Sequence, residues 1–83
     1  MAKYNPLQTY FENASSSQTE ISLSFSQIEN IIGSKLPGSA SNHSAWWANE
    51  VEGKHVQAHS WMDAGWHVVD LDQARKWVKF TRA

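Results

Sequence analysis

The sequence predicts an α+β domain in which three or four short helices pack on a three-stranded antiparallel sheet. Alternation of apolar and polar residues predicts the strands: Glu20–Phe25, and a hairpin formed by Trp66–Leu71 and Lys76–Thr81. Between these strands, apolar residues recur at helical spacing. A chain of 83 residues has the length of one domain, so residues 1–83 are expected to share a single core.

The first predicted helix starts at Pro6, which suits a first turn, and Asn5 is its expected cap. The helix is expected to end near Asn13, before a polar, serine-rich loop over residues 14–19. Its apolar residues fall at i, i+3 and i+4 and form one face, made by Leu7, Tyr10 and Phe11.

A second helix is predicted directly after the first strand. Ser26 is its expected cap, and Glu29, three residues on, completes a capping box. Gly33 stands where a helix-ending glycine belongs. The apolar face of this helix is formed by Ile28, Ile31 and Ile32.

Two further helices are predicted in the tryptophan-rich middle of the chain. Residues 40–50 contain no helix breaker, and residues 54–64 place Ala58, Trp61 and Met62 on one face. Adjacent residues on a helix point about 100° apart, so Trp46 and Trp47 cannot both face one core. One of them is therefore expected in the core and the other at the rim.

The C-terminal hairpin is predicted to turn over residues 72–75. Val69 and Leu71 would share a face, in phase with Val78 and Phe80, whereas the opposite face would hold Trp66, Val68 and Trp77. Apart from one additional helix, the order of elements is that of a winged-helix domain. The sequence therefore predicts a winged-helix-like fold.

Composition narrows the possible functions. There is no cysteine, which excludes disulfides and thiolate zinc sites. No apolar run is long enough for a membrane span, and the N-terminus turns polar at once, so a cytoplasmic location without membrane contact is expected. The net charge of −1 argues against strong non-specific nucleic-acid binding, although the last third is mildly basic.

Metal binding and catalysis find little support in the residue patterns. His55 and His59 have the i, i+4 spacing of two metal ligands, and Asp63 continues the same face. The glutamate of a zinc-protease motif is missing from this run. No Gly-x-Ser-x-Gly turn or glycine-rich phosphate loop is present. We therefore expect neither a metal, nor a cofactor, nor an enzymatic activity.

Nucleic-acid recognition is the favoured function. Side chains that can bond or stack on bases gather in one predicted helix: Asn42, His43, Ser44, Trp46 and Asn49. Basic side chains stand on or beside the predicted hairpin, where a wing meets phosphates: Arg75, Lys76 and Lys79. DNA is therefore the expected partner of these eight residues.

Two alternatives remain open. The tryptophans can be core and the basic residues merely solvated. A tryptophan beside Asn, His and Ser is also typical of a protein interface, so the chain can be a protein-interaction module such as a phage-encoded inhibitor. Salt dependence separates the two binding functions, because phosphate contacts weaken steeply with salt. Nothing in the sequence fixes the oligomeric state.

Six segments are distinctive: YNPL (4–7), residues 23–33, LPGSA (36–40), WWAN (46–49), QAHSWMDAGW (57–66) and VKFTR (78–82). In these segments the chain resembles a small, functionally uncharacterised bacterial and phage domain family, and the resemblance covers nearly the whole chain. Such domains stand alone or are attached to nuclease-like or restriction-related proteins, which implies a regulatory or DNA-recognition role in restriction or phage defence. The family is often more basic around His43, where this chain has Asn42 and Ser44.

Overall fold

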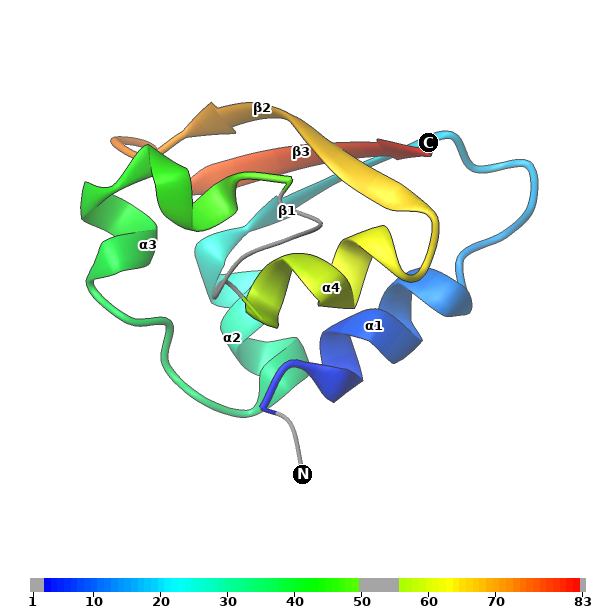
Figure 1. Cartoon of the computed structure of the whole chain (residues 1–83), viewed down its shortest axis with the longest axis horizontal. Helices are drawn as coiled ribbons and strands as arrows, with labels where there is room; N and C mark the ends of the chain where they lie inside the picture. Colours follow the sequence, from blue (N-terminus) through cyan, green and yellow to red (C-terminus); the bar gives the residue numbers. More distant parts are fainter. Residues whose placement is uncertain (1–2, 50–55, 83) are drawn as a thin grey trace.

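The computed structural model describes residues 3–49 and 56–82, and it confirms an α+β architecture. Figure 1 shows the sheet as one layer, with α1, α2 and α4 packed against one of its faces. The strands are all antiparallel and lie in the order β1-β3-β2. The likeness to a winged helix stays a prediction. The elements are α1 Asn5–Glu12, β1 Glu20–Ser24, α2 Phe25–Ile32, α3 Ser39–Asn42, the 3-10 helix η1 Ser44–Trp47, α4 Val56–Met62, β2 Trp66–Asp72 and β3 Trp77–Arg82.

Aromatic rings form the centre of the core. Trp47 stacks on Phe25 at a centroid distance of 5.1 Å and on Trp61 at 5.8 Å. Trp61 in turn contacts Phe80 of the central strand at 5.4 Å. Since one large ring buries about 150–250 Å², a few aromatic residues supply a large part of the buried apolar surface of so short a chain.

The first helix forms nearly as predicted. α1 ends at Glu12, one residue before the predicted Asn13, and its N-cap is Tyr4 rather than Asn5. Leu7 and Phe11 are buried on the expected face, but Tyr10 is 39% exposed. The i+3 position therefore lies at the edge of the buried stripe and not within it.

The second helix begins earlier than predicted. Ser24, not Ser26, is its cap: the Ser24 hydroxyl accepts from the Gln27 amide at 3.0 Å, and the Gln27 side chain accepts from the Ser24 amide at 2.7 Å. The predicted capping box of Ser26 and Glu29 is therefore wrong. Phe25 becomes the first residue of α2, which keeps its ring in the core. Gly33 ends the helix with φ +70°, as predicted.

The predicted helix over residues 40–50 is wrong. α3 ends at Asn42, His43 has an extended backbone (φ −129°, ψ 112°), and η1 follows. This break removes the conflict between the two adjacent tryptophans. Trp46 and Trp47 are 8% and 2% exposed, and their rings meet edge to face at 4.6 Å. Because residues 40–47 do not form one continuous helix, the rings of both Trp46 and Trp47 are buried.

A β-bulge changes the predicted faces of the hairpin. Val68 pairs with Phe80, but the register shifts between Val68 and Asp70, so that Leu71 pairs with Val78. Val69 is therefore 49% exposed instead of sharing a face with Leu71. Trp66 and Val68, predicted on the opposite face, turn to the core. The turn spans residues 73–76, one position later than predicted.

Candidate nucleic-acid interface

The turn of the hairpin lies against α3. The Lys76 ammonium donates to the Ser41 hydroxyl at 3.0 Å, and the Gln73 amide donates to the Ala40 carbonyl at 3.0 Å. Figure 1 shows α3 beside this turn at one end of the sheet. We call this region the α3–hairpin surface, made by Ser41, Asn42, His43, Ser44, Gln73, Ala74, Arg75 and Lys76.

Lys76 adopts an unusual backbone conformation. Among the described residues other than glycine it alone has a positive φ, 62°. Its carbonyl accepts from the Phe25 amide at 2.9 Å, and its ammonium lies 5.9 Å from the Phe25 ring centroid. A left-handed backbone costs a non-glycine residue about 1–2 kcal/mol. Contacts with α2 and α3 thus hold a lysine where glycine would fit without strain.

The structure gathers five of the eight predicted contact residues on this surface. Asn42, His43 and Ser44 are exposed, and so are Arg75 and Lys76. The Arg75 side chain is 83% exposed and reaches Asp72 only at 3.9 Å. Exposed ion pairs of this kind are weak, so Arg75 is free to exchange Asp72 for another anion.

Lys79 lies apart from the other five. It alternates along β3 with the buried Val78 and Phe80, which places it on the outer face of the sheet. There its ammonium is 3.3 Å from the Glu20 carboxylate. Lys79 therefore lies outside the α3–hairpin surface and has Glu20 as its ion-pair partner.

Trp46 cannot offer a ring to a base. Besides Trp47, its ring contacts Tyr4 edge-on at 5.9 Å. The expectation that one of the two tryptophans lies at the rim is wrong, because both are buried. Both rings belong to the core.

Asn49 joins three separate parts of the fold. Its Oδ1 accepts from the Trp61 indole at 3.0 Å and from the Val68 amide at 2.9 Å, and its Nδ2 donates to the Val68 carbonyl at 2.9 Å. These bonds occupy the same amide that was predicted to contact DNA. Its partners are far away in the sequence, so no local pattern reveals this role.

Comparison with known proteins adds a family. The model of one domain family, described as "Domain of unknown function (DUF7662)", matches residues 4–83. The chain belongs to this family. Its description assigns no activity, which confirms the resemblance to an uncharacterised family, whereas the bacterial or phage origin stays a prediction. No curated protein and no solved structure matches the chain.

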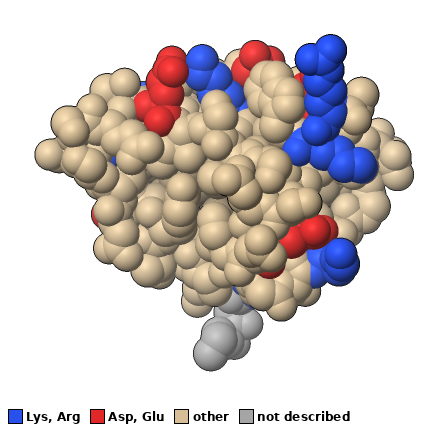
Figure 2. Space-filling view, turned by 180° about the vertical axis from the view of Figure 1, so that it is seen from behind, with Lys and Arg blue, Asp and Glu red and all other residues tan. Residues whose placement is uncertain are grey.

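Few charged side chains of this DUF7662 domain are visible on the face shown in Figure 2, which is the back of the view in Figure 1. Figure 2 shows that most of this face is uncharged and that its basic atoms lie mainly at the upper right. The hairpin turn lies at the upper left of Figure 1, which the half-turn of the molecule brings to that corner. On this face the basic atoms therefore gather mainly near the corner of the hairpin turn, with acidic atoms also along the upper edge.

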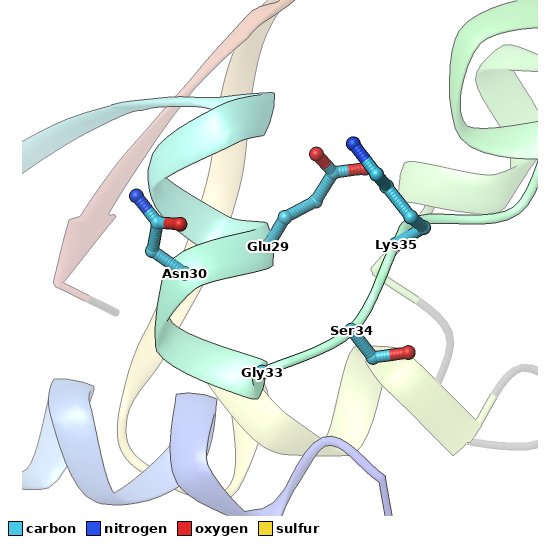
Figure 3. Close-up of a pocket in the computed structure, with 5 residues that line it drawn as sticks. All are labelled: Glu29, Asn30, Gly33, Ser34 and Lys35. Carbon is cyan, nitrogen blue, oxygen red and sulfur yellow. The ribbon is translucent and has the colours of Figure 1, made fainter.

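A shallow depression of about 400 Å³ lies at the end of α2. In Figure 3 the Glu29 side chain reaches toward Lys35, whereas Asn30 points to the other side of the helix. The Glu29 carboxylate accepts from the Leu36 amide at 2.8 Å. Glu29 thus fixes the connection from α2 to α3, which replaces its predicted capping role.

The predicted histidine pair is only partly described. His55 lies outside the described residues, and His59 is 3.6 Å from the Asp63 carboxylate. Over residues 3–49 and 56–82, no three His, Asp or Glu side chains are grouped as metal ligands. In the same ranges, no helix combines the length and the apolar character needed to cross a bilayer.

Proposed function

We propose that this domain is a non-enzymatic module that binds duplex DNA through the α3–hairpin surface. The observation that carries the proposal is the pair of hydrogen bonds that fixes the hairpin turn against α3, from Lys76 to Ser41 and from Gln73 to Ala40. They bring two exposed cations beside exposed amide, imidazole and hydroxyl groups, although the two segments are far apart in sequence. A regulatory role linked to restriction or phage defence would follow from such binding.

Each group on this surface has a chemical role in the proposal. Arg75 and Lys76 neutralise phosphates, which provides affinity and orientation. Asn42, His43 and Ser44 carry donors and acceptors that match base edges in a groove. With two phosphate contacts, log affinity should fall with log salt at a slope of about −2, which is shallow for a DNA-binding protein.

The buried tryptophans favour duplex over single-stranded DNA. Proteins that bind single strands stack the bases on exposed aromatic rings. The residues that form the α3–hairpin surface include no Phe, Tyr or Trp, and Trp46 and Trp47 are in the core. Recognition through polar side chains and cations suits the edges and backbone of a duplex.

Fluorescence anisotropy with random-sequence duplex and single-stranded DNA, at about 50 and 200 mM salt, tests the proposal. We expect duplex binding to weaken about tenfold over this range, because the release of counterions from two phosphates contributes less to binding at higher salt. A variant with Arg75→Gln and Lys76→Gln should lose both the affinity and the salt dependence. Lys79→Gln is the matched control: it removes an equal type of charge from the outer face and should bind as the wild type does.

Two results would contradict the proposal: no duplex binding at the lower salt concentration, or an equal loss of affinity in Lys79→Gln. Protein binding, the alternative function, would then be the better explanation of the surface. It is favoured by the outer face of the sheet, where Val69 is 49% exposed and Trp77 is half-buried. Binding there would respond weakly to salt and would be weakened by Val69→Ser and not by the Arg75 and Lys76 changes.

A further inference from the structure

Side chains of the same molecule occupy the free edge of β2. In the order β1-β3-β2 this strand lies at one end, so among the described residues no further strand lies beside it. The Asn49 side chain bonds to both the amide and the carbonyl of Val68, each at 2.9 Å. The Asp70 carboxylate accepts from the amide of Leu71, also at 2.9 Å. We call Asn49 and Asp70 the edge caps of β2.

Both capped residues direct their backbone groups away from the rest of the sheet. In an antiparallel sheet the residues of a central strand bond alternately to one neighbour and to the other. The Arg82 amide of β3 donates to the carbonyl of Thr19, next to β1, so every second residue back along β3 bonds toward β1 as well. Val68 and Leu71 pair with two of these residues. Their own backbone groups therefore point outward, where a further strand would bind.

The stretch between the caps favours strand pairing. Val68 and Val69 are β-branched, which suits a strand, and Val69 is 49% exposed. The bulge between Val68 and Asp70 interrupts the ladder at the same place, and the Asp70 carboxylate brings a charge. Bulges and charged side chains are two features by which edge strands avoid pairing with other chains. Several protective features thus coincide on the part of β2 that is best suited to pairing.

The opposite edge of the sheet offers less to a further strand. β1 has five residues, and the amide of Ser24, its last residue, donates to the Gln27 side chain at 2.7 Å. Short edge strands are poor templates for pairing. The edge of β2, which has seven residues, is therefore the one at which pairing has to be prevented.

We infer that the edge caps and the bulge keep this domain monomeric, because they prevent β2 from pairing with β2 of a second copy. Such a pair is two-fold symmetric and antiparallel, so it brings the same residues of the two copies together. The inference is independent of DNA binding, because neither cap belongs to the α3–hairpin surface.

Sedimentation equilibrium over a wide range of protein concentration tests the inference. We expect the wild type to keep the mass of one chain throughout. Asp70→Val removes a cap and a charge and lengthens the β-branched run, so its average mass should rise with concentration. Asp70 is exposed, so its replacement leaves the core intact, and circular dichroism verifies the fold of each variant.

Lys79→Val is the matched control. Residue 79 lies opposite Asp70 on the same outer face, but in the central strand, which has no free edge. The substitution replaces a charge by the same apolar side chain and should leave the domain monomeric.

Single cysteines show which edge pairs, because the chain contains none of its own. In the Asp70→Val background, Val69→Cys should form a disulfide between two copies under mild oxidation, since antiparallel β2 strands bring these residues close. Ser22→Cys, in the middle of β1, should form it much more slowly.

Four outcomes would overturn the inference. The wild type would associate, or Asp70→Val would stay monomeric. Lys79→Val would associate as strongly as Asp70→Val, which would show that an apolar outer face and not the free edge drives pairing. Cross-links would form at residue 22 rather than 69, which would assign the pairing to β1. Failure of DNA binding has no bearing on any of these results.

Discussion

Asn49 shows how a single side chain can fix long-range structure. Its amide satisfies both polar backbone groups of Val68 and the indole of Trp61, which is fully buried. A buried donor without a partner costs about 1–3 kcal/mol. The side chain therefore stabilises the junction between η1, α4 and β2.

Asn49→Ala should lower the free energy of unfolding by about 2–3 kcal/mol, because it leaves the Trp61 indole and the Val68 amide without their acceptor. Urea denaturation followed by tryptophan fluorescence measures this loss. Asn42→Ala, at an exposed position, is the control and should change stability by less than about 0.5 kcal/mol. Equal effects of the two substitutions would show that the Asn49 bonds contribute little.

Lys76 provides a second test on one residue. Lys76→Gly and Lys76→Ala remove the same ammonium, but only glycine relieves the left-handed backbone at φ 62°. We expect the glycine variant to be more stable than the alanine variant by about 1 kcal/mol. Their melting curves measure the difference, and duplex binding should fall equally in both. If alanine is the more stable, the backbone at Lys76 is not strained.

The sequence indicated which side chains have groups that can contact DNA. It did not indicate which of these groups already have hydrogen-bond partners within the fold. Asn42, His43, Ser44 and Asn49 are all exposed residues, but the side chain of Asn49 bonds to Val68 and Trp61. That difference depends on partners brought together only by folding. The local sequence pattern contains no information on such contacts. Prediction from residue type alone therefore included Asn49, whose side chain has partners within the fold.

Two serines near the start of α2 could each cap this helix. Both Ser24 and Ser26 are serines three residues before a side chain that can complete a capping box, Gln27 and Glu29 respectively. The strand pattern assigned Phe25 to β1 and so favoured Ser26. In the structure α2 begins at Phe25, whose ring stacks on Trp47, and Ser24 is therefore the residue that caps the helix.

Ser24→Ala should therefore lower the free energy of unfolding by about 1 kcal/mol, the usual effect of removing an N-cap. Ser26→Ala, which removes the same hydroxyl two positions later, should change it by less than about 0.5 kcal/mol. Thermal unfolding of the two variants gives the comparison. A larger loss from Ser26→Ala would restore the originally predicted cap.

Element types were easier to predict than element details. Alternation identified the three strands, and helical spacing identified α1, α2 and α4. The bulge at Val69 and the break at His43 were missed, since each depends on which rings must reach the core. A period-2 pattern assumes an uninterrupted strand, and one extra residue inverts every later assignment.

At the scale of the whole molecule, stability depends on a continuous group of rings. Trp46 contacts Tyr4 and Trp47, and Trp47 continues through Trp61 to Phe80. The number of tryptophans indicated an aromatic core, but it did not indicate that both Trp46 and Trp47 would be buried. Both rings can be buried because the helical backbone is interrupted at His43. The sequence around His43 contains no glycine or proline that would have predicted this interruption.

Trp46→Ala and Trp47→Ala should each lower the free energy of unfolding by about 3–5 kcal/mol. Each leaves a large cavity in a core that has few other residues to fill it. Chemical denaturation followed by circular dichroism measures both losses. Trp77→Ala, at a half-buried position on the outer face, should cost clearly less. Retention of full stability in Trp46→Ala would place that ring at the rim after all.

The order of strands also constrains how the domain is made in a cell. β3 lies between β1 and β2 and follows both of them in the sequence, so pairs such as Ile21 with Phe80 join segments that are far apart along the chain. Until β3 leaves the ribosome, neither β1 nor β2 has a neighbouring strand to pair with. Folding of this domain should therefore be governed by long-range pairing and be slow for so small a chain.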